Sequence, residues 1–342
     1  MEQEYFPYKV FCELTNACNL NCKHCLTESS KPLPDELSTN ELYSVFQQLA
    51  DYGTEYVELT GGEPLLRKDF DKILDLLNRL DFQISICSNG ILITEKMCCQ
   101  FKEYGVEKLQ LSIDGLENTH DFIRNKKGAF QAVIKSISLL KMQDLDVNVR
   151  STAMRDNLDE LTSLANLISK LDVDGFGAVR LFPVGRAKIE CPEQALNARD
   201  MLKFHQIMQE IEKDYSHVMK ITYDHCGFFD RPIFDWYREH NQTICQCGRK
   251  ICVIKPNGTV TPCEIFALPA GNLRRQSFVQ IWENSESFAM FRNFDPNQLK
   301  GTCRNCSEKY ICGGYCRALA MTYFNDFCAE DPTCWRVQIN KK

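Results

Sequence analysis

The sequence lacks the features that would place the chain in a membrane or on a nucleic acid. No apolar run among its 342 residues reaches the ~18 residues of a membrane-spanning helix. The first five residues, MEQEY, have neither the basic start nor the apolar stretch of a secretory signal peptide. Asp and Glu outnumber Lys and Arg by 46 to 40, and the net charge of −6 argues against a broad nucleic-acid-binding surface. We therefore expect a cytoplasmic protein that binds neither membranes nor nucleic acids.

Cysteine, by contrast, is abundant, with 19 residues in the chain. Thiols stay reduced in the cytoplasm, and a chain of this length can bury a core without disulfide staples. Metal ligation is therefore the first interpretation of the cysteines. Most of them fall into two groups, a tight one at residues 18–25 and a wider one at residues 245–334.

Short apolar segments alternate with amphipathic helical patterns over the first two thirds of the chain. Strands are predicted at residues 9–15, 55–60, 82–87, 108–113, 145–152 and 175–182. The first helix between them begins with a capping box of Ser38 and Glu41. No G-x-G-x-x-G segment follows any strand, so the fingerprint of dinucleotide binding is absent. Six strands joined by helices predict an α/β fold with parallel strands, in the form of a partial (β/α)6 TIM barrel.

Unusual residues follow five of these strands, at the end where barrel strands carry functional groups. The cysteine triplet follows the first strand, and Gly61-Gly62-Glu63-Pro64 follows the second. The other segments are Ser88-Asn89-Gly90, Asp114-Gly115 and Pro183-Val184-Gly185-Arg186. Turn residues occur in any such loop, so each segment alone is weak evidence. Their accumulation on one rim, beside three cysteines, predicts the functional site there.

Cys18, Cys22 and Cys25 can present three thiolates to one metal centre from a single loop. A cubane iron–sulfur cluster normally takes four thiolates, so three would leave one iron open to a ligand from outside the protein. A zinc site completed by His24 or Cys12 is the alternative. It fits less well, because C-x2-C pairs dominate zinc sites and no partner pair is close in sequence. The triplet therefore favours a catalytic iron–sulfur cluster.

With these motifs the sequence resembles the radical S-adenosylmethionine (radical SAM) enzymes. The triplet matches the family's CxxxCxxC signature, and residues 61–64 match its GGEP segment. The resemblance implies an oxidoreductase in which SAM binds the open iron and is cleaved to a 5′-deoxyadenosyl radical that takes a hydrogen atom from the substrate. Arg150 is a candidate for binding the SAM carboxylate, with a rim ion pair as its alternative. The other implied SAM contacts are His24, Gly61, Gly62, Glu63, Ser88, Asn89, Ser112 and Asp114.

The second cysteine group contains more thiols than one tetrahedral zinc ion or one cubane cluster can use. Zinc ribbons are the alternative, but the x5 and x3 spacings on either side of Cys312 fit zinc poorly. The pattern resembles the SPASM extension of radical SAM enzymes, which implies two auxiliary clusters and three [4Fe–4S] clusters in all. By that resemblance an outer cluster is held by Cys303, Cys306, Cys312 and Cys334, and an inner cluster by Cys245, Cys247, Cys263 and Cys316.

Some features of this group stay open in the sequence. Cys226 and Cys252 are alternatives to Cys245, and an inner cluster with an open iron is another. Cys334 is preferred to Cys328, because its distance from Cys316 fits the family better. The turn Asn257-Gly258 predicts a hairpin that presents Cys263. Glu264 beside it is a candidate general base, with a solvated surface carboxylate as the alternative.

We expect a radical SAM barrel at residues 1–213, a connector at 214–244 and a SPASM domain at 245–342. Only 17 residues precede Cys18, so we expect no N-terminal domain that grips a leader peptide. The first hypothesis for the substrate is a peptide or protein residue that is oxidised, crosslinked or epimerised. The alternatives are small-molecule chemistry (tetrapyrrole side-chain decarboxylation or aminosugar dehydrogenation) and a non-catalytic iron–sulfur or zinc scaffold. A flavodoxin- or ferredoxin-type protein is the expected reductant.

Overall fold

The computed structural model describes residues 5–224, 234–240, 243–266 and 268–339. Its centre is one ten-stranded sheet with the strand order β10-β9-β8-β1-β2-β3-β4-β5-β6-β7. The strands are β1 (Lys9–Glu13), β2 (Tyr56–Thr60), β3 (Gln83–Ser88), β4 (Val106–Ser112), β5 (Asp146–Ala153), β6 (Gly175–Arg180), β7 (Lys220–Tyr223), β8 (Ile251–Ile254), β9 (Thr259–Thr261) and β10 (Gly271–Asn272). β1 to β7 pair parallel in sequence order. The six predicted strands are confirmed, each within two residues at either end.

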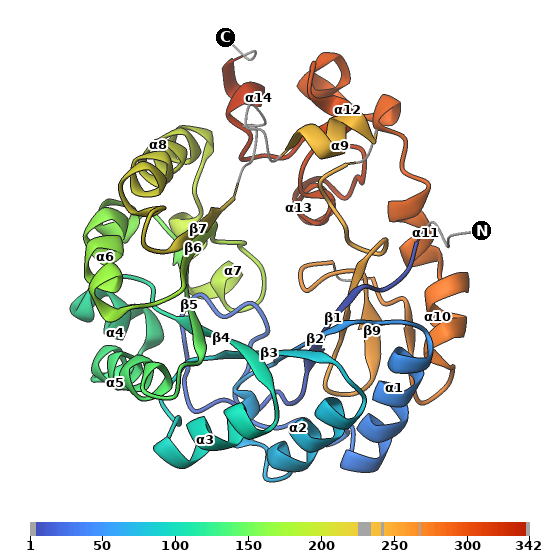
Figure 1. Ribbon diagram of the computed structural model, residues 1–342. Coiled ribbons are helices and arrows are strands. Elements are labelled where there is room, and N and C mark those ends of the chain that lie inside the picture. Colours follow the sequence, from blue (N-terminus) through green and yellow to red (C-terminus); the bar gives the residue numbers. More distant parts are fainter. Residues whose placement is uncertain (1–4, 225–233, 241–242, 267, 340–342) are drawn as a thin grey trace.

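Helices cover the outer face of the curved sheet, and the strands line its inside (Figure 1). The helices are α1 (Thr39–Asp51), α2 (Phe70–Arg79), α3 (Glu95–Glu103), α4 (Glu117–Arg124), α5 (Ala129–Lys141), α6 (Leu161–Ile168), α7 (Ala187–Glu190), α8 (Ala198–Tyr215), α9 (Asp235–Glu239), α10 (Phe278–Asn284), α11 (Glu286–Arg292), α12 (Lys309–Cys312), α13 (Arg317–Phe324) and α14 (Trp335–Ile339). The capping box of Ser38 and Glu41 is present at the start of α1. The partial (β/α) barrel predicted from the sequence is confirmed.

The hydrophobic core lies between the sheet and these helices. β5 shows the principle: Val147 and Val149 are buried in the core, whereas Asn148 and Arg150 alternate with them and are less buried. Alternation places successive side chains of a strand on opposite faces of the sheet. The less buried set therefore faces the inside of the barrel, and the loops at the carboxyl ends of the strands form its rim.

Strands from the C-terminal part of the chain extend the barrel sheet. β8 pairs parallel with β1, so that Lys9 lies opposite Ile251. β8 and β9 are antiparallel, and Gly258 adopts a φ of 81° in the turn between them. The predicted hairpin before Cys263 is therefore confirmed, and its strands share a sheet with the barrel.

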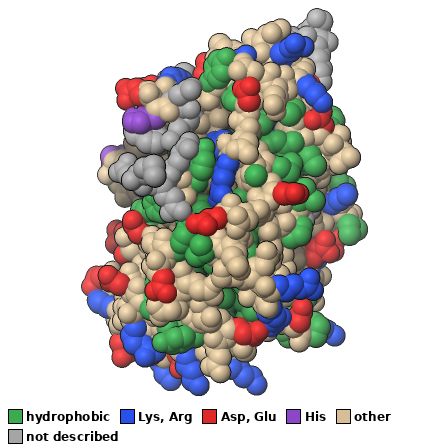
Figure 2. Space-filling view, turned by 90° about the vertical axis from the view of Figure 1, so that its right-hand side faces the viewer, with side chains coloured by type: hydrophobic (Ala, Val, Ile, Leu, Met, Phe, Trp, Pro, Cys, Tyr) green, Lys and Arg blue, Asp and Glu red, His purple; other side chains and the backbone are tan. Residues whose placement is uncertain are grey.

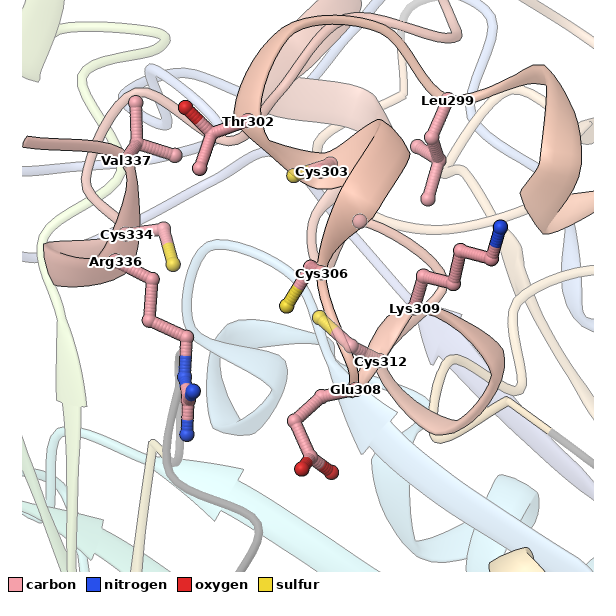
Figure 3. A pocket seen from close by; sticks show the side chains of 11 residues that line it. Leu299, Thr302, Cys303, Cys306, Glu308, Lys309, Cys312, Cys334, Arg336 and Val337 are labelled. Carbon is pink, nitrogen blue, oxygen red and sulfur yellow. The ribbon is translucent and has the colours of Figure 1, made fainter. Parts of the chain in front are cut away.

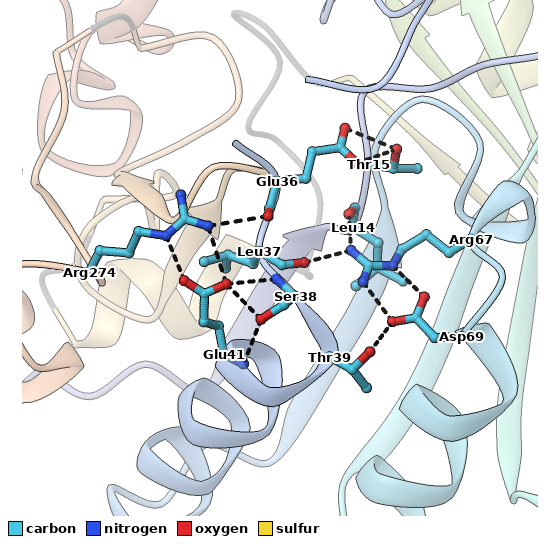
Figure 4. Close-up of polar contacts among 10 residues, drawn as sticks. All are labelled: Leu14, Thr15, Glu36, Leu37, Ser38, Thr39, Glu41, Arg67, Asp69 and Arg274. Atoms are coloured by element: carbon cyan, nitrogen blue, oxygen red, sulfur yellow. Dashed lines mark hydrogen bonds and ion pairs between the residues drawn. The ribbon is translucent and has the colours of Figure 1, made fainter. Parts of the chain in front are cut away.

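Polar contacts also join the C-terminal part of the chain to the barrel (Figure 4). The guanidinium of Arg274 donates to the Glu41 carboxylate over 2.6 Å and to the Asp35 carbonyl over 2.8 Å. Nearby, Arg67 forms an ion pair of 2.7 Å with Asp69 and donates to the carbonyl of Leu14 at the end of β1. Arginine–carboxylate pairs thus stabilise the part of the rim next to the cysteine loop.

The described residues contain no membrane-spanning helix. The face seen in Figure 2 has no separate region of one charge. No helix in the described ranges is long and apolar enough to cross a bilayer. Lys and Arg side chains are interspersed with Asp and Glu on that face. The charge pattern there agrees with the modest net charge of −6.

Candidate active site

The cysteine triplet lies in the loop that follows β1. The loop is closed at its base, where the Cys18 amide donates to the Ser30 carbonyl over 3.0 Å. Cys22 is buried, whereas Cys18 and Cys25 are half-buried. One loop at the carboxyl end of the barrel therefore carries all three thiols, as the sequence predicts.

The Gly61-Gly62 segment after β2 packs directly on this loop. The amide of Gly62 donates to the Thr15 carbonyl over 2.7 Å, and the amide of Glu63 to the Ala17 carbonyl over 2.8 Å. A Cβ atom on Gly61 or Gly62 would lie 2.4 Å or 2.2 Å from backbone oxygens of the cysteine loop. Both positions need glycine because of this close approach.

Glu63 fastens the loop after β2 to the loop after β3. Its carboxylate is fully buried and accepts hydrogen bonds of 2.9 Å from the Ser88 hydroxyl and from the Asn89 amide. Burial raises the pKa of Glu63 to about 7. The Asn89 side chain reaches on to Asn19 in the cysteine loop over 2.7 Å. Loops one, two and three of the barrel thus form one hydrogen-bonded unit.

Asp114 is the centre of a second polar group on the same rim. Its buried carboxylate lies 2.7 Å from Nε of Arg124 and 3.4 Å from Nε2 of His24, and it accepts the amide of Thr152 over 2.9 Å. Burial alone would raise the pKa of Asp114, but the charge of Arg124 and the neighbouring histidines hold it below its ordinary value. The backbone amide of Asp114 donates to Nδ1 of His120 over 3.1 Å.

His24 stands between the cysteine loop and Asp114. Burial lowers its pKa to about 4, so the imidazole is neutral near pH 7. Its Nδ1 atom is buried and has no hydrogen-bond partner among the residues that the structure describes. Buried polar atoms nearly always have partners, so this nitrogen is a position where a ligand can supply one.

The segment after β6 closes over the cysteine loop from the other side. The Arg186 side chain donates to the carbonyls of Cys22 over 2.8 Å and Ser29 over 2.7 Å. Gly185 has a φ of 57°, and a Cβ there would lie 2.2 Å from the Leu26 carbonyl. The structure therefore brings all five predicted rim segments to one site.

Ser112, the last residue of β4, lies opposite Arg150 in β5. The guanidinium of Arg150 donates to the Thr222 hydroxyl over 3.3 Å. Within the described ranges no carboxylate oxygen lies within 4.0 Å of it, so the alternative of a rim ion pair is not formed. Burial lowers its pKa. A cation without a paired carboxylate therefore faces the inside of the barrel.

The Glu264 side chain is exposed to solvent. The protein around it and the charges of Glu13 and Glu58 raise its pKa to about 7, although nearby lysines oppose the shift. Lys255 and Glu13 form an ion pair of 2.5 Å beside it. The surroundings of Glu264 are thus charged barrel residues from β1, β2 and β8.

The inner cysteines of the C-terminal part lie in one cluster with aromatic side chains. Phe266, Phe291 and Ala318 form its buried centre, and the packed sulfurs are those of Cys245, Cys247, Cys263 and Cys316. The Cys263 sulfur accepts the Phe266 amide over 3.2 Å, and the Cys316 sulfur accepts the Leu319 amide over 3.4 Å. A hydrogen bond from Cys247 lowers the pKa of Cys245 to about 7.

The outer cysteines line a small cavity next to α12 and α14. Figure 3 shows their sulfurs directed into it, with Leu299, Thr302 and Val337 around them. The four cysteines of this cavity are Cys303, Cys306, Cys312 and Cys334. The two groups of four that the sequence predicts are thus the groups that the structure assembles.

The remaining cysteines lie elsewhere. Cys252 is fully buried in β8, in the core that also contains Cys12, and is apart from the Cys245 cluster. Cys328 does not line the outer cavity, and its sulfur contacts Gln298 at 4.0 Å. Cys226 lies outside the described residues. Cys245 thus lies with the inner group and Cys334 in the outer cavity, whereas Cys252 and Cys328 lie in neither.

No three His, Cys, Asp or Glu side chains in the described part of the chain converge as the ligands of one ion must. Zinc binds thiolate sulfurs at a Zn–S distance of ~2.3 Å, so its sulfur ligands must lie close together. Thiolates around an iron–sulfur cube bind different irons and stand further apart.

Sequence reasoning missed Arg124, His120 and the buried pair of Arg180 with Asp331. His120 and Arg124 are four residues apart on α4, so both point to one side of the helix, toward Asp114. That spacing just after the Asp114-Gly115 segment was an available signal. Arg180 and Asp331 are 151 residues apart and leave no such trace.

Comparison with known proteins places the chain in a family. Residues 12–168 match the family model of the radical SAM superfamily, and residues 245–307 match SPASM, an iron–sulfur cluster-binding domain. The chain is 31% identical over 339 residues to the AdoMet-dependent heme synthase of Methanosarcina barkeri, with 96% of each chain covered. It is 30% identical over 306 residues to the sporulation killing factor maturation protein SkfB of Bacillus subtilis, with 88% of this chain and 69% of that protein covered.

Solved structures share the fold. SuiB of Streptococcus suis bound to S-adenosylmethionine superposes with a TM-score of 0.80 at 17% identity, covering 96% of this chain and 77% of that one. A partial barrel with three cysteines beside a Gly-Gly-Glu loop defines an iron–sulfur enzyme that uses SAM. The chain belongs to the radical SAM superfamily and carries a SPASM domain. It is a radical SAM enzyme whose cofactors are SAM and iron–sulfur clusters.

Proposed function

We propose that this enzyme cleaves SAM reductively and uses the resulting radical to decarboxylate a propionate side chain of a tetrapyrrole. The observation that carries the substrate class is the match to the Methanosarcina barkeri heme synthase over 96% of both chains. Heme synthases of two other species are 30% and 29% identical and cover 94% of this chain. This assignment takes the small-molecule alternative of the sequence analysis ahead of the peptide hypothesis.

Cys18, Cys22 and Cys25 hold the cluster that reduces SAM in this proposal. When bound, SAM and the cluster supply the 5′-deoxyadenosyl radical. Of the proposed SAM contacts, His24 is supported by its unpartnered buried Nδ1, which suits a polar atom of the ligand. The others follow the resemblance: Gly61, Gly62, Glu63, Ser88, Asn89, Ser112, Asp114 and Arg150.

Two further [4Fe–4S] clusters complete the proposal. One is held by the Cys245, Cys247, Cys263 and Cys316 group, and the other by the four cysteines of the outer cavity. Conversion of a propionate to a vinyl group releases carbon dioxide, one hydrogen atom and one electron. The hydrogen atom is recovered in 5′-deoxyadenosine, and the electron needs an acceptor in the same protein. Auxiliary iron–sulfur clusters are acceptors of this kind.

The charges inside the barrel fit a substrate that bears carboxylates. Arg150 has no carboxylate partner among the described residues, and it faces the same interior as the ion pair of Lys255 with Glu13. A guanidinium without a paired carboxylate attracts anions, so an anionic substrate group would be stabilised there. The decarboxylation releases no proton, so it leaves no step for Glu264 as a general base; that candidate role belongs to the peptide alternative.

A peptide or protein residue is the second candidate substrate. It is favoured by the 30% identity to SkfB, a maturation protein, over 88% of this chain.

The barrel is proposed to span residues 1–213, the connector 214–244 and the SPASM domain 245–342. A flavodoxin- or ferredoxin-type protein is proposed as the physiological reductant.

The test is anaerobic reconstitution with iron and sulfide, followed by SAM, dithionite and a metalloporphyrin that carries propionates. We expect 5′-deoxyadenosine, and porphyrin product that has lost carbon dioxide in mass spectrometry. Absence of 5′-deoxyadenosine would contradict the enzyme assignment. Its formation without decarboxylated porphyrin would move the proposal to the peptide substrate. About 12 iron atoms per chain are expected for three clusters of four irons.

A further inference from the structure

Arg124 connects Asp114 to one thiol of the cysteine triplet. Its Nε lies 2.7 Å from the Asp114 carboxylate, and its Nη1 lies 3.8 Å from the Cys22 sulfur, within hydrogen-bonding distance for sulfur. Arg124 is buried, and Asp114 is fully inaccessible to solvent. The guanidinium is planar with several donors in fixed directions, so one side chain can serve both partners.

The other two thiols of the triplet have different neighbours. The Cys18 sulfur lies 4.0 Å from the amide oxygen of Asn19, and the Cys25 sulfur lies 3.6 Å from the Thr27 hydroxyl. Both of these neighbours are neutral. Among the recorded contacts of the three sulfurs, the cationic donor is therefore found at Cys22.

We propose that Arg124 donates a charge-assisted hydrogen bond to the Cys22 thiolate and thereby raises the reduction potential of the cluster in the first loop. The inference rests on the proposed function, in that the triplet must hold the SAM-cleaving cluster. Reduction adds one negative charge to a cluster that is already anionic. A fixed positive charge and an N–H donor at a ligand sulfur stabilise that extra charge.

Asp114 is what holds the arginine in this position. The ion pair fixes Nε, and the same carboxylate is anchored by the amide of Thr152 and approached by His24. A buried guanidinium without a counter-charge would be costly, so the pair also keeps the cation on the rim. Arg124 thus acts on the cluster through its ligand sulfur and is a positioning residue.

The test compares reduction potentials of the reconstituted enzyme, followed by electron paramagnetic resonance during a redox titration. The signal that changes on addition of SAM reports the first cluster, and the auxiliary signals serve as internal references. For Arg124→Gln we expect the reduction equilibrium of the first cluster to become at least tenfold less favourable, a shift of 59 mV for one electron. Arg124→Lys, which keeps the charge, should shift it less than Arg124→Gln.

Two further variants separate this effect from general damage. Arg67→Gln breaks a comparable rim ion pair, with Asp69, that has no recorded contact to a cysteine sulfur, and it should leave the potential unchanged. The effect of Arg124 can also be measured where the Asp114 charge is already absent, by comparing Asp114→Asn with the double variant Asp114→Asn/Arg124→Gln. The double variant should have the lower reduction potential of the two.

An unchanged potential in both Arg124→Gln and the double variant would overturn the proposal. If Cys22→Ala left the iron content and the SAM-responsive signal intact, the triplet would not hold the cluster. In that case the proposed function fails first, and the two failures are distinguishable.

Discussion

The cysteine loop of the barrel and the inner cysteine group of the C-terminal part surround their thiols in different ways. Around the loop lie charged side chains: Asp114, Arg124 and a neutral His24 with an unpartnered nitrogen. Around the inner group lie aromatic rings, and backbone amides donate to the sulfurs of Cys263 and Cys316. Outer-shell donors tune a metal centre, so we expect the clusters of the two regions to differ in their properties.

The strongest test of this difference is to remove one thiol from each region. Cys22→Ala should abolish 5′-deoxyadenosine formation, because the loop would then supply two thiolates where the cluster needs three. Cys263→Ala should lower iron by about four atoms per chain. It should still permit SAM cleavage in the presence of dithionite, while losing substrate turnover.

Iron analysis and chromatography of 5′-deoxyadenosine distinguish these outcomes. The matched control is Cys328→Ala, since Cys328 lies outside both groups of four. It should behave as the unmodified protein does. Equal loss of SAM cleavage in the Cys22 and Cys263 variants would show that the two regions do not have separate roles.

A second prediction concerns the buried ion pair that joins the two regions. Arg180 on β6 and Asp331 are both almost fully buried, with Nη2 and Oδ2 2.8 Å apart, and Asp331 also accepts the amide of Cys316 over 3.3 Å. Asp331→Asn should lower the free energy of unfolding by up to ~3 kcal/mol, because it removes one carboxylate paired with the buried Arg180 while Asp224 remains 3.4 Å from its Nε. Urea unfolding measures this loss.

The same variant should affect the auxiliary clusters more than the first cluster. Asp331 lies three residues before Cys334 and contacts Cys316, which are cysteines of the outer and inner groups. We expect lower iron content with the SAM-responsive signal retained. Glu286→Gln, at an exposed carboxylate of α11, is the control and should change neither quantity.

A third prediction tests the close packing of the first region. Gly62→Ala places a Cβ 2.2 Å from the carbonyl oxygen of Ala17, which belongs to backbone and cannot turn aside. We expect a loss of ~1–3 kcal/mol of stability and a displaced cysteine loop, seen as slower SAM cleavage. Gly53 has a φ of 91°, and a Cβ there would meet no atom within 4 Å, so Gly53→Ala should leave SAM cleavage intact. Equal SAM cleavage by both variants would contradict the close packing.

The parts of this fold that the sequence predicts are those encoded locally. Strands β1 to β6 and the rim loops follow from apolar patterns of five to eight residues and from cysteine spacing. The pairing of β8 with β1 joins residues more than 240 positions apart through strands of four and five residues, so no local pattern contains it. The contact of Arg124 with Cys22 likewise depends on how α4 packs against the cysteine loop. The two groups of four cysteines were predictable because their spacing matches a family motif.

The last prediction, with the smallest expected effect, is that pH changes the stability of the cysteine-loop region more than that of the inner cysteine group. His120 is buried beside Asp114, and burial lowers its pKa to about 4, whereas no histidine follows His240 in the sequence. Above pH 6.5 the imidazole is neutral both folded and unfolded, so stability does not depend on it. Between pH 6.5 and 4 the unfolded chain takes up the proton first, and stability falls as the pH falls.

At pH 5 this linkage amounts to about 2 kcal/mol for His120 relative to pH 7. Protonation at Nδ1 would also displace the Asp114 amide that donates to it over 3.1 Å. In urea unfolding at a series of pH values, His120→Gln should therefore give a flatter curve than the unmodified protein between pH 7 and 5. His217→Gln, at an exposed side chain, should give a parallel curve. If the His120→Gln curve is also parallel, the acid sensitivity of the barrel rim has another origin, and the polar character of the first site does not make it the more pH-dependent of the two regions.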